Sequence, residues 1–192
     1  MNPYELPKSV RINGREFEIR SDYRVILDIL IALRDPDMDD ETKAAVMLMI
    51  FYPNWKEIRK EDIAEAQQKA VEFIDCGYKD DGKPHPQLVD WEQDASLIIP
   101  AVNKAAHMEV RSVQYMHWWT FFSFYMEIGE SLFANVINIR SKKAKHKKLE
   151  KYEREFYNEN RAIIDIKKKD SAEVREEKDA ILKWLDRQGV SE

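Results

Sequence analysis

The sequence predicts a mainly α-helical protein, with one compact helical domain, an N-terminal β-hairpin and a basic, helical C-terminal extension. Glycine (5) and proline (7) are scarce among 192 residues, while 35% of the residues are charged and 44% are hydrophobic. This composition favours helices over sandwiches that need many glycine turns. Apolar residues recur at helical spacing through most of the chain, and residues 10–19 carry the only good strand signal.

The predicted hairpin is centred on Asn13-Gly14, which lies between two alternating runs. This pair is the strongest short-range signal for a two-residue turn. A turn at this position pairs Val10 with Phe17 and places their side chains on one apolar face. Because a lone hairpin is marginally stable, we expect this face to lie on helices or on a partner's sheet.

Three capped helices are expected after the hairpin, each with apolar residues on one stripe. They are residues 22–34 (capped by Ser21 or Asp22), a second from Asp39 or Asp40 to about Phe51 (followed by Pro53), and residues 62–75 (followed by Gly77 as a C-cap).

A fourth helix is expected from near Asp90, where Pro100 should kink or divide it because proline removes a helical hydrogen bond. The most apolar helix is expected over about 109–139. It is apolar most of the way round, so its residues 113–137 should be the most buried. The expected core residues of this helix include Phe122, Met126 and Phe133.

Charge divides the chain into two parts. Residues 1–139 contain 15 basic and 24 acidic residues and are expected to form an acidic body, whereas residues 140–192 contain 16 and 12. The second part should begin with a basic helical segment and end in an amphipathic helix. This helix either packs on the same domain or docks on another copy or on a partner. A capping box, Asp170 with Glu173, opens this last helix. Its apolar stripe consists of Val174, Ile181, Trp184 and Leu185.

No catalytic, metal or cofactor site is predicted, so we expect the protein not to be an enzyme. The chain lacks GxSxG, HExxH, Walker and GxGxxG motifs. Its one cysteine, Cys76, is expected to be a buried structural thiol. His107 and His117 are ten residues apart, too far for a metal pair on one helix, and His117 beside Trp118 is expected to be a core residue.

A cytosolic protein without a membrane segment is expected. The N-terminus lacks the apolar core of a signal peptide. The longest uncharged aromatic stretch, residues 112–126, is about five residues short of a bilayer span.

Candidate partner-binding residues come from three features. Two adjacent tryptophans on a helix cannot face the same direction, so one of them, Trp119, is expected to reach a groove or an interface. The basic run allows three interpretations: contact with an acidic protein, contact with nucleic-acid phosphates, or a solvated helix face. The remaining candidate residues lie on the apolar stripe of the expected C-terminal helix. The candidates are Trp119, Arg140, Lys142, Lys143, Lys147, Lys148, Ile181, Trp184 and Leu185.

The order of several segments resembles a known family. These segments are VRINGREFEI followed by SDYRVILDIL, EDIAEAQQKAVEFIDCG at 61–77, DWEQDASLI at 90–98, MHWWTF at 116–121, and VINIRSKKAKHKKLEKYEREFYNENR at 136–161. In this order they resemble the tail-assembly-chaperone-like proteins of long, non-contractile-tailed phages and prophages of Gram-positive hosts. Such proteins often carry a turn before the Trp pair, whereas AAHMEVRSVQYMHWW here is expected to be continuous helix.

The resemblance implies a non-catalytic assembly factor that chaperones the tape-measure protein in the host cytoplasm and is absent from the finished particle. Its implied partners are the tape-measure protein, the major tail protein and further copies of itself, which could associate head to tail through the hairpin edge. The alternative is a nucleic-acid-binding phage accessory protein that acts through residues 140–154. The net charge of −5 argues against nucleic acid as a partner.

Overall fold

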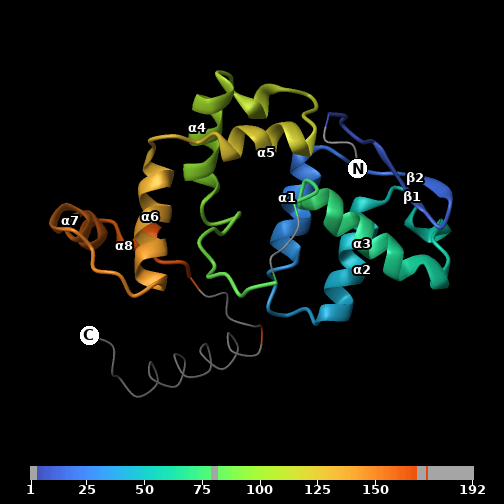
Figure 1. The fold of residues 1–192 in the computed structure, drawn as a ribbon, viewed down its shortest axis with the longest axis horizontal. Coiled ribbons are helices and arrows are strands. Elements are labelled where there is room, and N and C mark those ends of the chain that lie inside the picture. Colours follow the sequence, from blue (N-terminus) through green and yellow to red (C-terminus); the bar gives the residue numbers. More distant parts are fainter. Residues whose placement is uncertain (1–3, 79–81, 168–171, 173–192) are drawn as a thin grey trace, which may run out of the picture.

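The computed structural model describes residues 4–78, 82–167 and 172, and it confirms a mainly helical fold with an N-terminal two-stranded hairpin (Figure 1). The elements are β1 (Ser9–Ile12), β2 (Arg15–Glu18), α1 (Tyr23–Ala32), α2 (Asp40–Phe51), η1 (Trp55–Glu57), η2 (Lys60–Asp62), α3 (Ile63–Ile74), α4 (Ala95–Ala106), η3 (Val110–Ser112), α5 (Trp118–Met126), α6 (Leu132–Ala144), α7 (Lys151–Glu159) and α8 (Arg161–Ile164).

The hairpin has the predicted register, with Val10 opposite Phe17. Asn13 and Gly14 both have positive φ, +46° and +78°, which the two-residue turn requires. The apolar face is covered by helices of the same chain, because Val10 and Phe17 belong to the main core. The Asn13 side chain also donates a hydrogen bond to Asp62 at the start of α3 (3.1 Å), which fixes the turn against that helix.

The first three predicted helices are confirmed, together with the N-terminal caps of the first two, whereas the C-cap of α3 is Asp75, two residues before the predicted Gly77. Asp22 accepts a hydrogen bond from the Arg24 N–H at 2.9 Å, and Asp39 accepts one from the Thr42 N–H at 2.8 Å. Gly77 follows α3 with a φ of +77°. These ends were predictable because caps are local features of the sequence.

The prediction of one continuous helix over 109–139 is wrong. His107 ends α4 in the left-handed conformation (φ +53°), and η3 and extended residues separate it from α5. The Asn103 side chain stabilises this turn by accepting a hydrogen bond from the Val110 N–H at 2.9 Å. The expected continuous helix before the Trp pair is therefore a turn.

A second break separates α5 from α6. Gly129 lies in this gap, and Ser131 caps α6 by accepting a hydrogen bond from the Ala134 N–H at 3.1 Å. The break changes which side chains are buried: Phe133 is 4% exposed, as expected, but Met126 is 58% exposed, so its predicted burial is wrong. Phe122 is only partly buried.

Pro100 does not divide α4, which runs uninterrupted from Ala95 to Ala106 with the Pro100 side chain exposed. The helix begins five residues later than the predicted start at Asp90. Asp94, the residue before it, is 1% exposed and ties this helix to the C-terminal part of the molecule.

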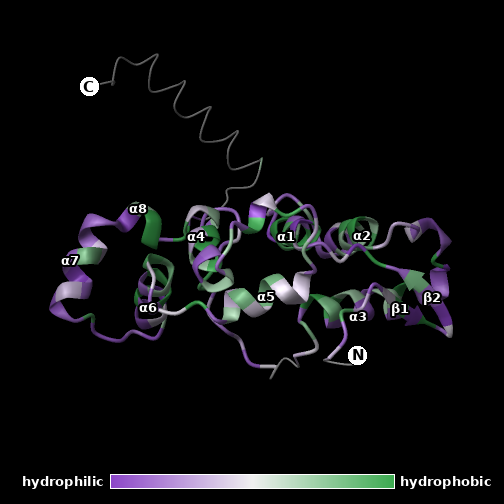
Figure 2. Cartoon of the chain, turned by 90° about the horizontal axis from the view of Figure 1, so that it is seen from above, coloured by the Kyte–Doolittle hydropathy of each residue, from purple (hydrophilic) through white to green (hydrophobic). Residues whose placement is uncertain are grey.

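The molecule is elongated, with the hairpin, α2 and α3 at one end and α6, α7 and α8 at the other (Figures 1 and 2). The main core fills the hairpin end and the middle, and a smaller cluster of Val136, Ile139 and Ile164 lies at the α6–α8 end. The boundary predicted at residue 140 falls inside α6. The helix expected after the Asp170–Glu173 capping box lies outside the described residues.

Candidate partner-binding surface

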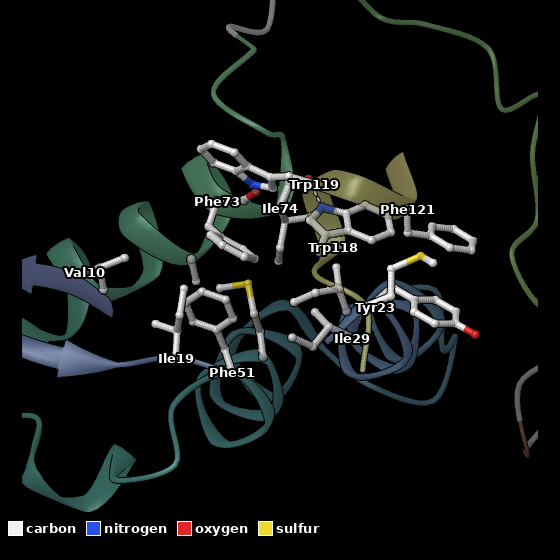
Figure 3. Packing of buried hydrophobic residues seen from close by; sticks show 14 of the residues in the cluster. Val10, Ile19, Tyr23, Ile29, Phe51, Phe73, Ile74, Trp118, Trp119 and Phe121 are labelled. Carbon is white, nitrogen blue, oxygen red and sulfur yellow. Dashed lines mark hydrogen bonds between the residues drawn. The ribbon is translucent and has the colours of Figure 1, made fainter. Parts of the chain in front are cut away.

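Trp118 and Trp119 open α5 and lock it onto the end of α3. The ring N–H of Trp118 donates to the Ile74 carbonyl at 2.8 Å, and that of Trp119 donates to the Phe73 carbonyl at 2.9 Å. Figure 3 shows the two indole rings directed away from each other. Both are buried in the core, at 1% and 8% exposure. Trp119 also lines a hollow on one face of α5, as expected of a tryptophan that reaches a groove, and its contact with a partner stays a prediction.

An apolar groove, here called the α5 groove, lies between α1, the end of α3 and one face of α5. Its volume is about 460 Å³. The aromatic rings of Trp91, Trp118 and Phe122 form much of its lining, with centroids 5.4 Å apart for Trp118–Phe122 and 6.2 Å for Trp91–Trp118. The complete lining is Leu30, Ile74, Asp75, Tyr78, Trp91, Trp118, Phe122 and Met126.

The groove continues into a second hollow of about 630 Å³ on the neighbouring face of α5, which shares Tyr78, Phe122 and Met126 with it. Tyr78 is 67% exposed and Met126 is 58% exposed. Glu127 also lines this second hollow. A large aromatic floor with flexible and exposed side chains at its edge is typical of surfaces that bind an apolar partner segment.

A separate hollow of about 390 Å³ lies between α2 and α3 and is lined by Met49, Trp55 and Ile63, among others. Met49 is 46% exposed. Fewer aromatic side chains line this hollow, and it lies on a different pair of helices. It can therefore be compared with the α5 groove in the same protein.

Arg140 is buried and cannot contact a partner, contrary to the prediction. Its guanidinium forms a two-pronged ion pair with Asp94, at 2.6 and 2.8 Å, and also donates to the carbonyls of Leu88, Ile163 and Ile164 at 2.6–3.0 Å. Every donor group therefore has a partner within the chain. Arg140 holds α6 against α4 and the end of α8.

The predicted lysines fall into two groups. Lys142 donates to Glu153 at 2.6 Å, and this hydrogen bond raises the pKa of Lys142 and lowers that of Glu153. Lys143 donates to Asp165 at 2.5 Å. Lys147 and Lys148 are exposed between α6 and α7. Ile181, Trp184 and Leu185 lie outside the described residues.

His117 and Cys76 both lie in or beside the core. His117 is 3% exposed, as expected for a core residue, and caps α5 by accepting a hydrogen bond from the Trp119 N–H at 3.1 Å. Cys76 is partly buried, and this burial raises the pKa of its thiol to about 12. Within residues 4–78 and 82–167, no group of His, Cys, Asp and Glu side chains is arranged to hold a metal ion.

Tyr78 and Trp91 line the α5 groove but were not among the residues predicted from the sequence. Both lie outside regular helices, and helical periodicity therefore gives no signal for them. Their approach to Phe122, with a Tyr78–Phe122 centroid distance of 6.4 Å, depends on how α3 and α5 pack.

Comparison with known proteins supports a phage origin. None of the described helices is long and apolar enough to span a bilayer. No curated protein and no solved structure is significantly similar to the chain. The family model described as "Bacteriophage Gp15 protein" matches residues 4–166, which include the hairpin, the α5 groove and the Arg140–Asp94 ion pair. The chain therefore belongs to the Bacteriophage Gp15 protein family.

Proposed function

We propose that this protein is a non-catalytic phage tail assembly factor that chaperones the tape-measure protein in the host cytoplasm and is absent from the finished particle. Membership of a phage protein family supports a role in the phage life cycle. The resemblance of the ordered sequence segments to tail-assembly-chaperone-like proteins supports the assembly role.

The α5 groove is the observation that carries this proposal. Tape-measure proteins are long and helical, and they aggregate when their apolar stripes are exposed. An amphipathic helix binds by laying its apolar face into a hydrophobic groove. The aromatic lining of Trp91, Trp118 and Phe122, with Met126 at the edge, provides such a groove on a protein with a net charge of −5.

Co-expression with the tape-measure protein of the same phage, followed by pull-down, tests the proposal. We expect the wild-type chain to capture the tape-measure protein and keep it in solution. Met126→Glu should weaken capture by at least about tenfold, because it places an unpaired charge in the apolar contact. Met126 is 58% exposed in the free chain, so the substitution should leave the fold intact.

Met49→Glu is the matched control, since Met49 is also an exposed methionine beside an apolar hollow. It should capture the tape-measure protein as the wild type does. Absence of capture by the wild type, or equal losses in both variants, would contradict a role for the α5 groove.

A nucleic-acid-binding accessory role is the second candidate. The exposed Lys147 and Lys148 favour it, together with neighbouring exposed Lys145 and Lys151. The major tail protein and further copies of the chain are the other partners consistent with an assembly role.

A further inference from the structure

The two hollows along α5 contain acidic residues and no cation of the described chain. Asp75 lines the α5 groove and Glu127 lines the hollow that continues it, whereas no described Lys, Arg or His lines either of them. Glu127 is exposed, and no described residue forms an ion pair with its carboxylate. A cation on a partner would therefore find a carboxylate with which it can pair.

The ends of two helices add negative charge at the same place. Ile74, the last residue of α3, lines the α5 groove, and Met126, the last residue of α5, lines both hollows. Neither helix has a basic residue in its last turn. Because the C-terminal carbonyls of a helix carry a partial negative charge, both ends favour a nearby cation.

The aromatic lining is also suited to a cationic side chain. Ring faces attract cations, and the aliphatic stem of Lys or Arg packs on apolar surface while its charged head stays at the polar edge. Among the described residues, no Lys or Arg lies over the rings of Tyr78, Trp91 or Phe122. The hollow between α2 and α3 differs, since it contains Lys56, whose Nζ is 5.7 Å from the ring centroid of Trp55. That hollow has a cation of its own, whereas the α5 groove would take one from a partner.

We propose that the α5 groove and its continuation select an amphipathic helix that carries Lys or Arg beside its apolar anchors, with the cationic heads near Glu127. Charge complementarity distinguishes this partner from an acidic or uncharged apolar helix. The assignment of such a helix to the tape-measure protein rests on the proposed function, whereas the preference for a cationic helix does not.

Two synthetic helical peptides of about 18 residues, or five turns, test the preference. They share one leucine face, and the positions that flank this face are Lys in the first peptide and Glu in the second. Fluorescence anisotropy of the labelled peptides at about 50 mM salt, where screening is weak, measures their binding to the full chain. The Lys peptide should bind at least about tenfold more tightly than the Glu peptide, because like charges placed side by side oppose binding.

Glu127→Lys should reduce this preference to about twofold or less, because it replaces the carboxylate in the hollow by a cation. Glu41→Lys is the matched control, since Glu41 is also exposed and lines the hollow between α2 and α3. The two substitutions raise the net charge equally, so Glu41→Lys should keep most of the preference. Circular dichroism checks that both variants are folded. Equal losses in the two variants would reduce the effect to net charge and overturn the proposal, as would equal binding of the two peptides by the wild type.

A second copy of the chain in the groove would also overturn the proposal. Sedimentation velocity would then show dimers of the wild type that Met126→Glu dissociates, whereas we expect no such dimers. Tape-measure capture fails or succeeds independently of these results. If the Lys peptide is preferred and the tape-measure protein is not captured, the preference stands and the proposed function fails. If the tape-measure protein is captured and the two peptides bind equally, the proposed function stands and this inference fails.

Discussion

His117 is a single side chain that joins three parts of the molecule. Its Nε2–H donates to the Pro7 carbonyl at 2.9 Å, and its Nδ1 accepts from the Trp119 N–H at 3.1 Å. Residue 117 also pairs with Asp22 in an isolated antiparallel bridge. This arrangement requires a neutral ring, because Nδ1 must remain free of a proton to cap α5. Burial lowers the pKa of His117, and the nearby Lys8 lowers it further.

The lowered pKa predicts a loss of stability in mild acid. Above the unfolded pKa of about 6.5, His117 is neutral in both states and its contribution is complete. As the pH falls below that value, the unfolded chain takes up a proton that the folded chain resists, so the free energy of unfolding should fall by up to about 1.4 kcal/mol per pH unit. Urea unfolding at pH 7.5, 6.5 and 5.5 measures this decrease.

His117→Asn should remove the pH dependence between about 6.5 and 5.5, since Asn does not titrate and can still cap a helix. His146→Asn is the control, because His146 is exposed at a left-handed position (φ +53°) that Asn tolerates. An unchanged pH dependence in His117→Asn would show that other groups cause it.

For single residues, the sequence predicts that the two tryptophan side chains diverge, but it does not predict which groups surround each ring. Adjacent helical side chains must diverge, so the different directions of Trp118 and Trp119 could be predicted from helix geometry. Their ring N–H groups bond to Ile74 and Phe73, 44 and 46 residues away in the chain. Nothing local to the tryptophans reveals these bonding partners, so the sequence does not predict that both rings are held against the end of α3.

At the scale of elements, α6 depends on one buried ion pair for its position. Arg140 and Asp94 have side chains only 5% and 1% exposed. Removing one partner of a buried pair leaves an uncompensated charge, which costs about 3–5 kcal/mol. Arg140→Ala should therefore lower the free energy of unfolding by about this amount, as measured by urea unfolding followed by circular dichroism.

Lys147→Ala is the matched control on the same basic segment and should change the free energy of unfolding by no more than about 0.5 kcal/mol, since Lys147 is exposed. Similar effects from the two variants would mean that Arg140 is not the residue that holds α6. If Arg140→Ala greatly lowers the free energy of unfolding, then weaker partner binding by this variant is explained by the damaged fold and is not evidence that Arg140 contacts the partner.

Elements with strong local signals could be predicted, and interruptions within an apolar stretch could not. The hairpin register followed from Asn13-Gly14, and α1 and α2 began at their capping aspartates. Between α5 and α6, by contrast, apolar residues continue on both sides of the break. Gly129 and Ser131 are the only local signals there, and the helical periodicity of the flanking residues outweighed them.

At the scale of the whole molecule, charge is distributed unevenly along the long axis, with an excess of basic residues at one end. The α6–α8 end, residues 132–167, carries ten Lys and Arg against five Asp and Glu. Figure 2 places this end opposite the hairpin. The sequence predicts this asymmetry, but it does not predict that Arg140 and Lys142 are paired with Asp94 and Glu153 inside the chain.

This pairing predicts weak binding to nucleic acid. Each phosphate contact contributes about −0.9 to the slope of log affinity against log salt for duplex DNA. With Arg140, Lys142 and Lys143 held by carboxylates, the exposed cations of the basic segment include Lys147 and Lys148. We expect the protein to bind immobilised duplex DNA only at low salt and to elute below about 0.15 M, near physiological ionic strength. Retention above that concentration would instead favour the nucleic-acid-binding role, provided that the slope of log affinity against log salt falls in magnitude by about two in Lys147→Gln/Lys148→Gln. If the same double variant still captures the tape-measure protein, then the basic surface and the α5 groove have separate functions.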